Sequence, residues 1–251
     1  MKKILLGAAT ALAFGATGVA HADTAAVVGL SYSNADFGSG DLNTYGLDAG
    51  FNHEMMNGWD LQVDGQMGRV DVNGCCNSAG YGAVHLGMRT DTHELGAFVG
   101  LTDTFGVSGL GVGIEGEMFL GNFNLGASAA YADYDDANFN TSSIEVNGAY
   151  FFTPNFAVTG LVAENNIDGG MGGSDDFLTV GVGGEYRFDN SPASFNLGYR
   201  NADFDGGDAD VWSVGFKWDL GSDSIQDRTR HGVSFDGASN FFRNFNFLPV
   251  S

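Results

Sequence analysis

The chain has 251 residues, with 31 acidic and 10 basic side chains, a formal net charge of −21, and 40 glycines against only 3 prolines. Its hydrophobic fraction of 43% and its 21 phenylalanines exclude a disordered acidic protein, which would be poor in aromatic residues. The shortage of basic residues argues against nucleic acid as a partner, because binding to phosphates requires a positive surface. The length allows one large domain or two small ones, and so many glycines favour an all-β protein over a helical enzyme.

The first 22 residues have the pattern of a cleaved signal peptide. Lys2 and Lys3 precede an apolar segment from Ile4 to Ala20, and Ala20-His21-Ala22 supplies the cleavage pattern. A membrane-spanning helix is the alternative, but the segment is short and is interrupted by glycine. Cleavage would leave 31 acidic and 8 basic residues. We therefore expect an exported protein. Because no later apolar run approaches the ~18 residues of a spanning helix, it would have to cross a membrane as a barrel.

From residue 23 onward, apolar and polar residues alternate with the period of two that is typical of a β-strand. Trp212 and Val214, for example, alternate with Ser213 and Gly215. In chain order, the candidate strands begin near Ala25, Asn43, Trp59, Gly80, Glu94, Leu110, Phe123, Ile144, Phe156, Leu178, Phe195 and Trp212. We expect about 12 strands (10–14 possible) of roughly nine to eleven residues, the length with which a tilted strand crosses a bilayer.

The connections between these strands alternate in length. Five are short and lie at residues 52–58, 90–93, 120–122, 153–155 and 189–194. The other six are longer, polar and rich in Asp, contain no Lys or Arg, and lie at residues 34–41, 71–79, 103–109, 133–143, 165–176 and 202–210. Outer-membrane barrels have this asymmetry, with short turns and both termini on the periplasmic side. The predicted fold class is therefore an all-β, antiparallel, up-and-down transmembrane β-barrel over residues 23–220.

Aromatic residues gather near both sets of connections. Near the short ones are Phe51, Trp59, Phe119, Phe123, Phe152, Phe156, Phe188, Phe195 and Trp218, and near the long ones are Tyr32, Tyr45, Tyr131, Tyr199 and Trp212. Such residues form the two girdles that flank the apolar band of a membrane barrel. A soluble β-protein with an aromatic core is the alternative.

The signal peptide, the strand hairpins, the acidic connections and the closing aromatic strand Trp212-Ser213-Val214-Gly215-Phe216-Lys217-Trp218 together resemble the outer-membrane β-barrel proteins of Gram-negative bacteria, in particular the small porin-like families. The resemblance covers residues 23–220 and rests on pattern rather than on an invariant motif. It implies a place in the outer membrane, with membrane lipid, lipopolysaccharide and the barrel-assembly machinery as partners. The final strand of this family ends in an aromatic assembly signal, whereas this chain continues for 31 residues beyond Leu220.

If the apolar residues face lipid, the charged residues that alternate with them face the lumen, because a charge on the lipid side would cost about 2–4 kcal/mol. They are Asp48, Asp60, Asp64, Glu115, Glu117, Glu145, Glu185, Arg187, Arg200, Lys217 and Asp219. This pore-lining set has eight acidic and three basic members and predicts a preference for cations. The alternative is internal pairing, in which the three basic side chains bind neighbouring acidic ones and fill a narrow barrel.

Glycine is frequent at the same inward positions, for example at Gly50, Gly96, Gly100 and Gly111. Glycine in a strand usually marks a bend or a close approach, and here it also keeps side-chain volume out of the lumen. We therefore favour an open, narrow, water-filled path. The predicted function is passive diffusion of small hydrophilic solutes and ions, with no cofactor. A non-conducting structural or adhesion-type barrel that acts through its acidic extracellular loops is the alternative.

Residues 221–251 form a tail that is too rich in Arg and Phe for a loose periplasmic extension. Its members of these two types are Arg228, Arg230, Arg243, Phe235, Phe241, Phe242, Phe245 and Phe247. Three outcomes stay open for this tail. It docks into the acidic lumen as a plug, it docks onto a periplasmic partner, or it is a disordered end.

Other chemistry is only weakly indicated. Oxygen ligands for a divalent cation are offered by Asp133, Asp135, Asp136, Asp203, Asp205, Asp208 and Asp210, but without the spacing of a recognised calcium loop, and we expect no metal site. The adjacent Cys75 and Cys76 would form a strained vicinal disulfide or intermolecular bridges. His85 faces inward in this scheme, and no Gly-x-Ser-x-Gly motif occurs, so we expect no catalytic residue and no enzyme.

Overall fold

The computed structural model describes residues 24–245, apart from residues 39, 73–74, 135–136 and 170–172. The predicted signal peptide, residues 1–22, lies outside this part of the chain. The strands are β1 (Thr24–Asp36), β2 (Asp41–Glu54), β3 (Trp59–Val72), β4 (Cys75–Arg89), β5 (His93–Thr104), β6 (Val107–Leu120), β7 (Phe123–Tyr134), β8 (Phe139–Thr153), β9 (Phe156–Gly169), β10 (Ser174–Arg187), β11 (Ala193–Phe204) and β12 (Gly207–Leu220). A short 3-10 helix, η1 (Met56–Gly58), joins β2 to β3, and α2 (Ile225–His231) and α3 (Gly237–Phe245) follow β12.

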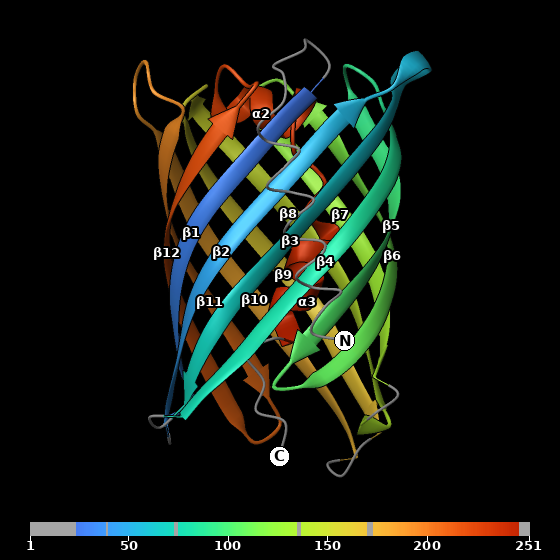
Figure 1. Ribbon diagram of the computed structural model, residues 1–251, viewed down its shortest axis with the longest axis vertical. Coiled ribbons are helices and arrows are strands. Elements are labelled where there is room, and N and C mark those ends of the chain that lie inside the picture. Colours follow the sequence, from blue (N-terminus) through green and yellow to red (C-terminus); the bar gives the residue numbers. More distant parts are fainter. Residues whose placement is uncertain (1–23, 39, 73–74, 135–136, 170–172, 246–251) are drawn as a thin grey trace.

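The strands form one closed antiparallel barrel in which each strand pairs with its sequence neighbours (Figure 1). Closure occurs between β1 and β12, where Ala26 lies opposite Leu220 and Asp36 lies opposite Asp210. A closed barrel leaves no unpaired strand edge, which is the condition for crossing a bilayer with strands. The predicted up-and-down barrel of about 12 strands is confirmed.

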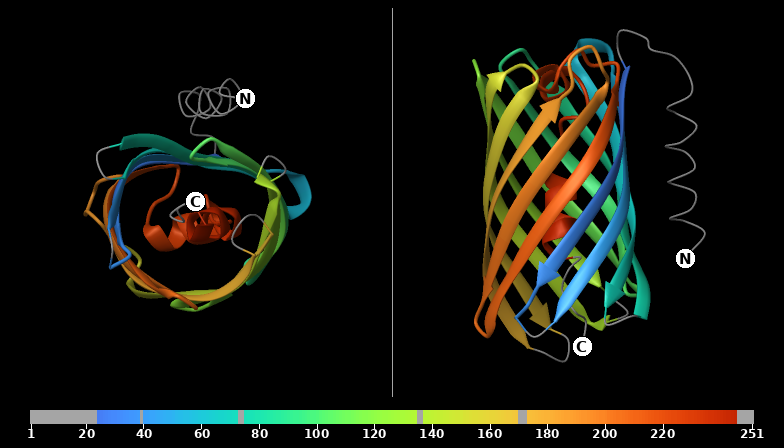
Figure 2. Two further views of the ribbon diagram at one scale, coloured as in Figure 1. Left: turned by 90° about the horizontal axis from the view of Figure 1, so that it is seen from below. Right: turned by 90° about the vertical axis from the view of Figure 1, so that its left-hand side faces the viewer.

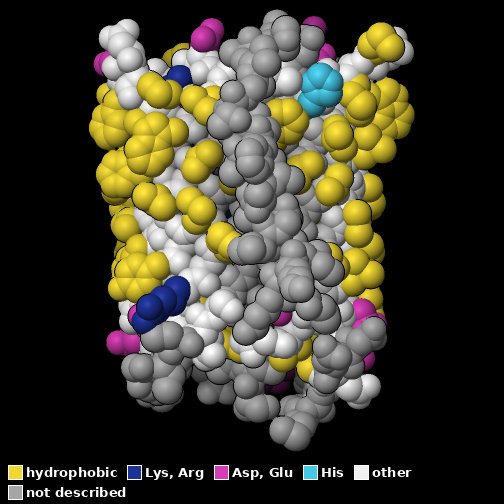
Figure 3. Space-filling view, viewed as in Figure 1, with side chains coloured by type: hydrophobic (Ala, Val, Ile, Leu, Met, Phe, Trp, Pro, Cys, Tyr) yellow, Lys and Arg dark blue, Asp and Glu magenta, His cyan; other side chains and the backbone are white. Residues whose placement is uncertain are grey.

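The alternation along each strand separates an apolar outer surface from a more polar interior. Leu30, Ile114, Ile144 and Val182 are all more than half exposed although they are hydrophobic. Figure 3 shows hydrophobic side chains across the visible face, with most charged groups near its two ends. Lipid around the barrel would bury this apolar band. None of the described helices has the length and apolar character that a membrane-spanning helix needs.

The strands are longer than the expected nine to eleven residues, and the polar connections are correspondingly shorter than expected. The shortest strands have 12 residues and the longest have 15. The connection predicted at residues 103–109 is a tight turn of only Phe105 and Gly106, both with positive φ (54° and 86°). Polar residues beyond the bilayer still need partners for their backbone groups, and pairing with the neighbouring strand supplies them. Polarity therefore marks where the apolar band ends, not where the strand ends.

One residue of the expected aromatic girdles faces the interior instead. Phe119 is only 6% exposed, and the guanidinium of Arg230 lies 5.7 Å from its ring centroid. Its neighbours in β6, Met118 and Leu120, are exposed on the outer surface, so the alternation along the strand directs Phe119 inward. Other residues of the same predicted girdle, such as Trp218, are exposed.

The segment that follows β12 turns back into the barrel. Figure 2 shows it inside the ring of strands, with α2 near the end where β12 finishes and α3 deeper in the lumen. The helix α3 packs against β4, β5, β6 and β7, whereas α2 packs against β9 and β10. The expectation of an unobstructed lumen is therefore wrong for this structure, because residues 221–245 occupy part of it.

Candidate functional site: the barrel interior

A cluster of five charged groups holds α2 at the end of the barrel that carries the short turns. The Arg228 guanidinium donates to Glu185 through Nη1 and Nη2, at 2.8 Å each, and to Asp219 Oδ2 at 2.9 Å. On the wall, Lys217 Nζ lies 3.0 Å from Glu185 and Arg187 Nη1 lies 3.7 Å from Asp219. Burial by itself lowers the pKa of an arginine, but the two carboxylates raise the pKa of Arg228 above its usual range. The guanidinium therefore stays charged.

The helix α2 is also tied to the turns around it. Its first turn is capped by Ser224, whose Oγ accepts a hydrogen bond from the Asp227 backbone N–H at 3.0 Å. The backbone N–H of Gln226 donates to the Pro154 carbonyl, and the Gln226 side chain donates to the Gly121 carbonyl. These contacts connect α2 to two short turns of the barrel rim.

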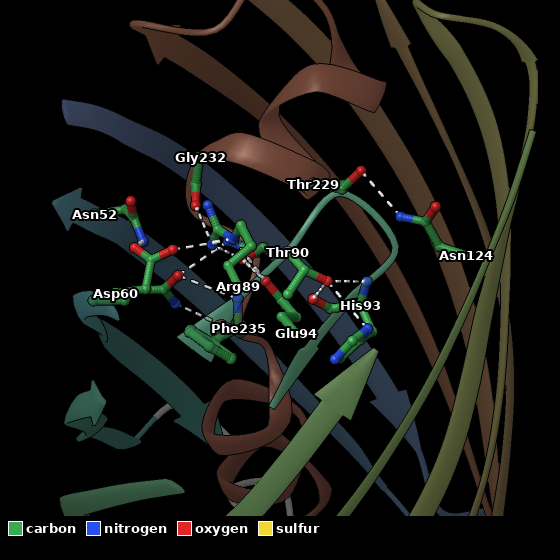
Figure 4. Close-up of polar contacts among 12 residues, drawn as sticks. Asn52, Asp60, Arg89, Thr90, His93, Glu94, Asn124, Thr229, Gly232 and Phe235 are labelled. Carbon is green, nitrogen blue, oxygen red and sulfur yellow. Dashed lines mark hydrogen bonds and ion pairs between the residues drawn. The ribbon is translucent and has the colours of Figure 1, made fainter. Parts of the chain in front are cut away.

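A second charged cluster, shown in Figure 4, holds the segment between the two helices. Arg89 Nε lies 3.1 Å from Asp60 Oδ2 and 3.0 Å from Glu94 Oε2, and all three side chains are buried. Arg89 Nη2 also donates to the Gly232 carbonyl at 3.2 Å and to Ser234 Oγ at 2.6 Å. The Ser234 hydroxyl in turn donates to Glu94 at 2.9 Å. One arginine of the wall thus joins two wall carboxylates to the tail.

The buried side-chain amide of Gln62 forms hydrogen bonds with the backbone of the same segment. Gln62 Nε2 donates to the Phe235 carbonyl at 2.5 Å, and Gln62 Oε1 accepts from the backbone N–H groups of Ser234 at 3.0 Å and Phe235 at 3.2 Å. A side-chain amide that satisfies three backbone groups supplies partners that an extended segment inside a barrel would otherwise lack.

Polar residues of the wall also bind α3. Glu115 Oε2 accepts from the Gly237 backbone N–H at 2.8 Å, and Glu145 Oε1 accepts from the Asn240 amide at 2.8 Å. The Arg200 guanidinium donates to Asn240 at 2.9 Å and to Asn244 at 3.0 Å.

Three further contacts involve wall carboxylates. Arg243 of α3 donates to Asp48 at 2.5 Å. His85 lies between two carboxylates, with Nε2 3.2 Å from Asp64 and Nδ1 2.5 Å from Glu115.

Pairs of glycines in the wall receive two aromatic rings of the tail. Gly87 lies opposite Gly96 in the β4–β5 ladder, and a Cβ added at these positions would lie 2.4 and 2.9 Å from the Phe235 ring. Gly100 lies opposite Gly111 in the β5–β6 ladder, and a Cβ there would lie 2.7 and 2.8 Å from the Phe242 ring. Three inward glycines that we expected to widen the lumen, Gly96, Gly100 and Gly111, are instead recesses that the tail fills, and Gly87 adds a fourth.

We expect Gly100→Ala to weaken docking of the tail, because the new methyl group would overlap the Phe242 ring. Overpacking of this kind costs about 1–3 kcal/mol. The measurement is hydrogen exchange of residues 237–245, which should become faster. Gly160→Ala is the matched control, because the atom nearest to its added Cβ lies 3.8 Å away. Phe242→Ala should offset Gly100→Ala in a double-mutant cycle, and strictly additive effects would contradict the recess.

A cavity of about 390 Å³ remains between the tail and the wall. Its lining includes Arg200, Lys217 and Asp48 of the wall, Asp236 and Arg243 of the tail, and many glycines and small polar residues. The two signs of charge are therefore mixed around this space.

The structure brings all eleven predicted pore-lining residues to the interior, where they occupy three regions. Four of them surround α2: Glu185, Arg187, Lys217 and Asp219. Five lie around α3 or bind the groups that hold it: Asp48, Asp64, Glu115, Glu145 and Arg200. Asp60 lies beside the inter-helix segment, and Glu117 borders the cavity. The alternative of internal pairing describes Arg187 and Lys217, while Arg200 binds α3 instead. Whether this set lines a conducting pore remains a prediction.

Several residues that organise the interior were not singled out from the sequence. Arg89, Glu94 and Gln62 make the contacts that fix the inter-helix segment. Arg89 and Glu94 lie next to the turn predicted at residues 90–93, so they were not assigned to the inward-facing positions of a strand. Extending the alternation of β4 and β5 to the ends of both strands would have placed Arg89 and Glu94 in the interior.

The acidic connections do not form a cation cage within the described residues, where no group of three or more His, Cys, Asp or Glu side chains is placed to hold a metal ion. Asp203 lies opposite Asp208 across the β11–β12 hairpin, and Asp210 accepts hydrogen bonds from Tyr199 and Asn201. The candidates Asp135 and Asp136 lie outside the described residues. Cys75 and Cys76 begin β4, and their redox state stays a prediction.

These features define a class of protein: a closed barrel with an apolar outer band, an acidic and glycine-rich interior, and both ends of the strand series on the side of the short turns. The family model described as Gram-negative porin matches residues 78–224, more than half of the chain. The chain therefore belongs to the Gram-negative porin family and is an outer-membrane protein. The predicted resemblance and location are confirmed. No curated protein matches the chain significantly.

Solved structures with the same fold share little sequence with this chain. An outer membrane channel from Pseudomonas putida F1 has a TM-score of 0.61 at 14% identity, covering 79% of this chain and 95% of that one. The KdgM porin, solved in complex with disordered oligogalacturonate, has a TM-score of 0.51 at 8% identity, covering 76% and 98%. The translocator domain of the autotransporter NalP from Neisseria meningitidis has a TM-score of 0.50 at 11% identity, covering 83% and 92%. At such identities the likeness concerns the fold alone.

Proposed function

We propose that this protein is an outer-membrane channel for the passive diffusion of small hydrophilic solutes and ions, with a preference for cations. The observation that carries the proposal is the interior, where charged side chains, amides and glycines line a cavity of about 390 Å³. Membership of the porin family supports the same function, with lipopolysaccharide and the barrel-assembly machinery as expected partners.

The preference for cations follows from the balance of charge on the wall. Of the predicted inward residues, eight are acidic and three are basic, and Glu94 and Arg89 add one of each. The tail offsets this excess in part by bringing Arg228 and Arg243 against wall carboxylates. A lumen with an excess of carboxylates attracts cations and repels anions.

Recordings of the purified full-length protein in planar bilayers test this function directly. In a KCl gradient, the reversal potential should have the sign of a cation-preferring channel. Asp48→Asn, which neutralises a carboxylate bordering the cavity, should shift the reversal potential toward zero. Asp91→Asn is the matched control, since Asp91 is exposed in a short turn outside the lumen. A reversal potential of the opposite sign would contradict the cation preference.

The filled lumen favours a second candidate, a non-conducting barrel that acts through its acidic extracellular connections. In that case α2 and α3 would be a permanent internal core. Recordings of the full-length protein separate the two functions, because a barrel with a permanent internal core would pass no current while residues 221–251 are present.

A further inference from the structure

Hydrophobic side chains form a layer across the lumen toward the end that carries the acidic connections. All twelve strands contribute to one apolar cluster, here called the apolar ring, through Ala35, Leu42, Val70, Tyr81, Phe98, Val107, Ala132, Phe139, Ile167, Phe177, Ala202 and Ala209. Its position is fixed by the strand register. Ala35 is opposite Leu42 beside the β1–β2 connection, and Ala202 is opposite Ala209 beside the β11–β12 connection.

The centre of the apolar ring is filled by three phenylalanines of α3. Phe241, Phe242 and Phe245 are at most 5% exposed. The ring of Phe242 stacks on Tyr81 at a centroid distance of 5.4 Å, and Phe245 meets Phe177 edge-on at 5.7 Å. Hydrophobic constrictions stop ions because water leaves them, so a channel with this cross-section filled is closed.

The two helices of the tail are held by different kinds of contact. Arg228 of α2 forms buried ion pairs with two carboxylates. In α3, Asn240 bonds to Glu145 and Arg200, and Asn244 bonds to Arg200, so the charge in these contacts comes from the wall alone. The charged residue of α3 that pairs with a wall carboxylate is Arg243, and its side chain and that of Asp48 remain 40% and 22% exposed. Charged contacts screened by water are weaker than buried ones. Of the two helices, α3 therefore has the weaker polar attachment.

We propose that α3 is the gate of the channel. Its docked position is the closed state, and passage of solutes requires Gly237–Phe245 to leave the apolar ring while α2 and the segment bound to Arg89 stay in place. The pivot is the junction of Asp236 and Gly237, which follows the recessed Phe235 and precedes the first turn of α3. This inference rests on the proposed channel function and adds to it the way in which the channel is closed.

The test compares two pairs of phenylalanines in a Cys75→Ser, Cys76→Ser background. Phe241→Ser with Phe245→Ser removes the pair at 5.2 Å inside the apolar ring. Phe195→Ser with Phe216→Ser removes a pair at 5.3 Å on the outer surface. The inner pair should raise the mean current through the full-length protein roughly tenfold or more, because destabilising the closed state shifts the population exponentially. The outer pair should leave the current unchanged. Arg243→Ala is a milder variant for use if the inner pair does not fold.

A cysteine at position 83 reports the movement itself. Ala83 is 3% exposed in the wall, and its Cβ lies 3.2 Å from a Cβ added at Gly100, beside the Phe242 ring. Ala83→Cys should react slowly with a charged thiol reagent in the background protein and much faster with the inner pair of substitutions.

The possible results distinguish failure of the gate from failure of the channel function. An inner pair that leaves both the current and the reactivity of Cys at position 83 unchanged, in a full-length protein that does conduct, would overturn the gate and leave the channel intact. The gate would also be wrong if the background protein already passed as much current as the truncated one. A truncated, folded barrel that passes no current would overturn the channel function and the gate with it.

Discussion

Deletion of residues 221–251 is expected to raise the single-channel conductance several-fold and to strengthen the preference for cations. The deletion removes α2, α3 and the segment between them, which together occupy the lumen. It also removes Arg228 and Arg243, and thereby leaves Glu185, Asp219 and Asp48 without their partners from the tail. Both effects act in the same direction, because the path becomes wider and its wall becomes more negative.

The measurement is the conductance and reversal potential of the truncated barrel in a salt gradient. A heat-dependent shift in gel mobility and an unchanged circular dichroism spectrum in the β region establish that the barrel has folded. A chain that lacks only residues 246–251 is the control, since it keeps both helices. Equal conductance of the truncated and full-length proteins would show that the tail does not restrict the path.

Replacing Arg228 with Met should weaken the attachment of α2 to the barrel wall. Glu185 and Asp219 would lose their ion pairs with the tail and keep those with Lys217 and Arg187, and breaking a buried ion pair costs up to about 3–5 kcal/mol. Hydrogen exchange of residues 225–231 should accelerate, and a protease added on the side of the short turns should cleave the tail sooner. Methionine approximates the length of the side chain, so that loss of packing contributes little.

Arg230→Met is the matched control for this experiment. Arg230 belongs to the same helix, but it donates to Asn124 and to the Gly121 carbonyl rather than to a carboxylate. Its replacement should change the exchange of α2 far less. If both substitutions accelerate exchange equally, the ion pairs of Arg228 are not what holds α2.

The barrel was predictable because membrane strands repeat a simple pattern. An alternation with period two assigns each strand residue to the lipid side or to the lumen, apart from the register shift between Phe151 and Thr153 of β8. It placed Glu185 and Asp219 in the interior without any knowledge of their partners. The alternation shows only which side of the wall a side chain faces, however. It does not show how far along the barrel axis the residue lies or how far its side chain reaches across the lumen. The contact of Arg200 with α3, for example, could not be read from it.

Docking of the tail in the lumen was one of three open outcomes, and the sequence could not decide among them because the structure of the tail depends on the wall around it. Two short helices of 7 and 9 residues would be marginal in water, so their sequence carries little signal of its own. The glycines were misread for a related reason. Gly100 and Gly111 indicate that something lies close to the wall, but only the three-dimensional arrangement shows that it is Phe242.

The short distance between the closing strand and the tail has a consequence for how the protein is made. β12 ends at Leu220 and α2 begins at Ile225, on the side of the membrane where the chain would leave the finished barrel. The pairing of β12 with β1 therefore brings the tail to the mouth of the barrel in the same step. We expect the tail to enter the lumen as the barrel closes, which would limit leakage during assembly.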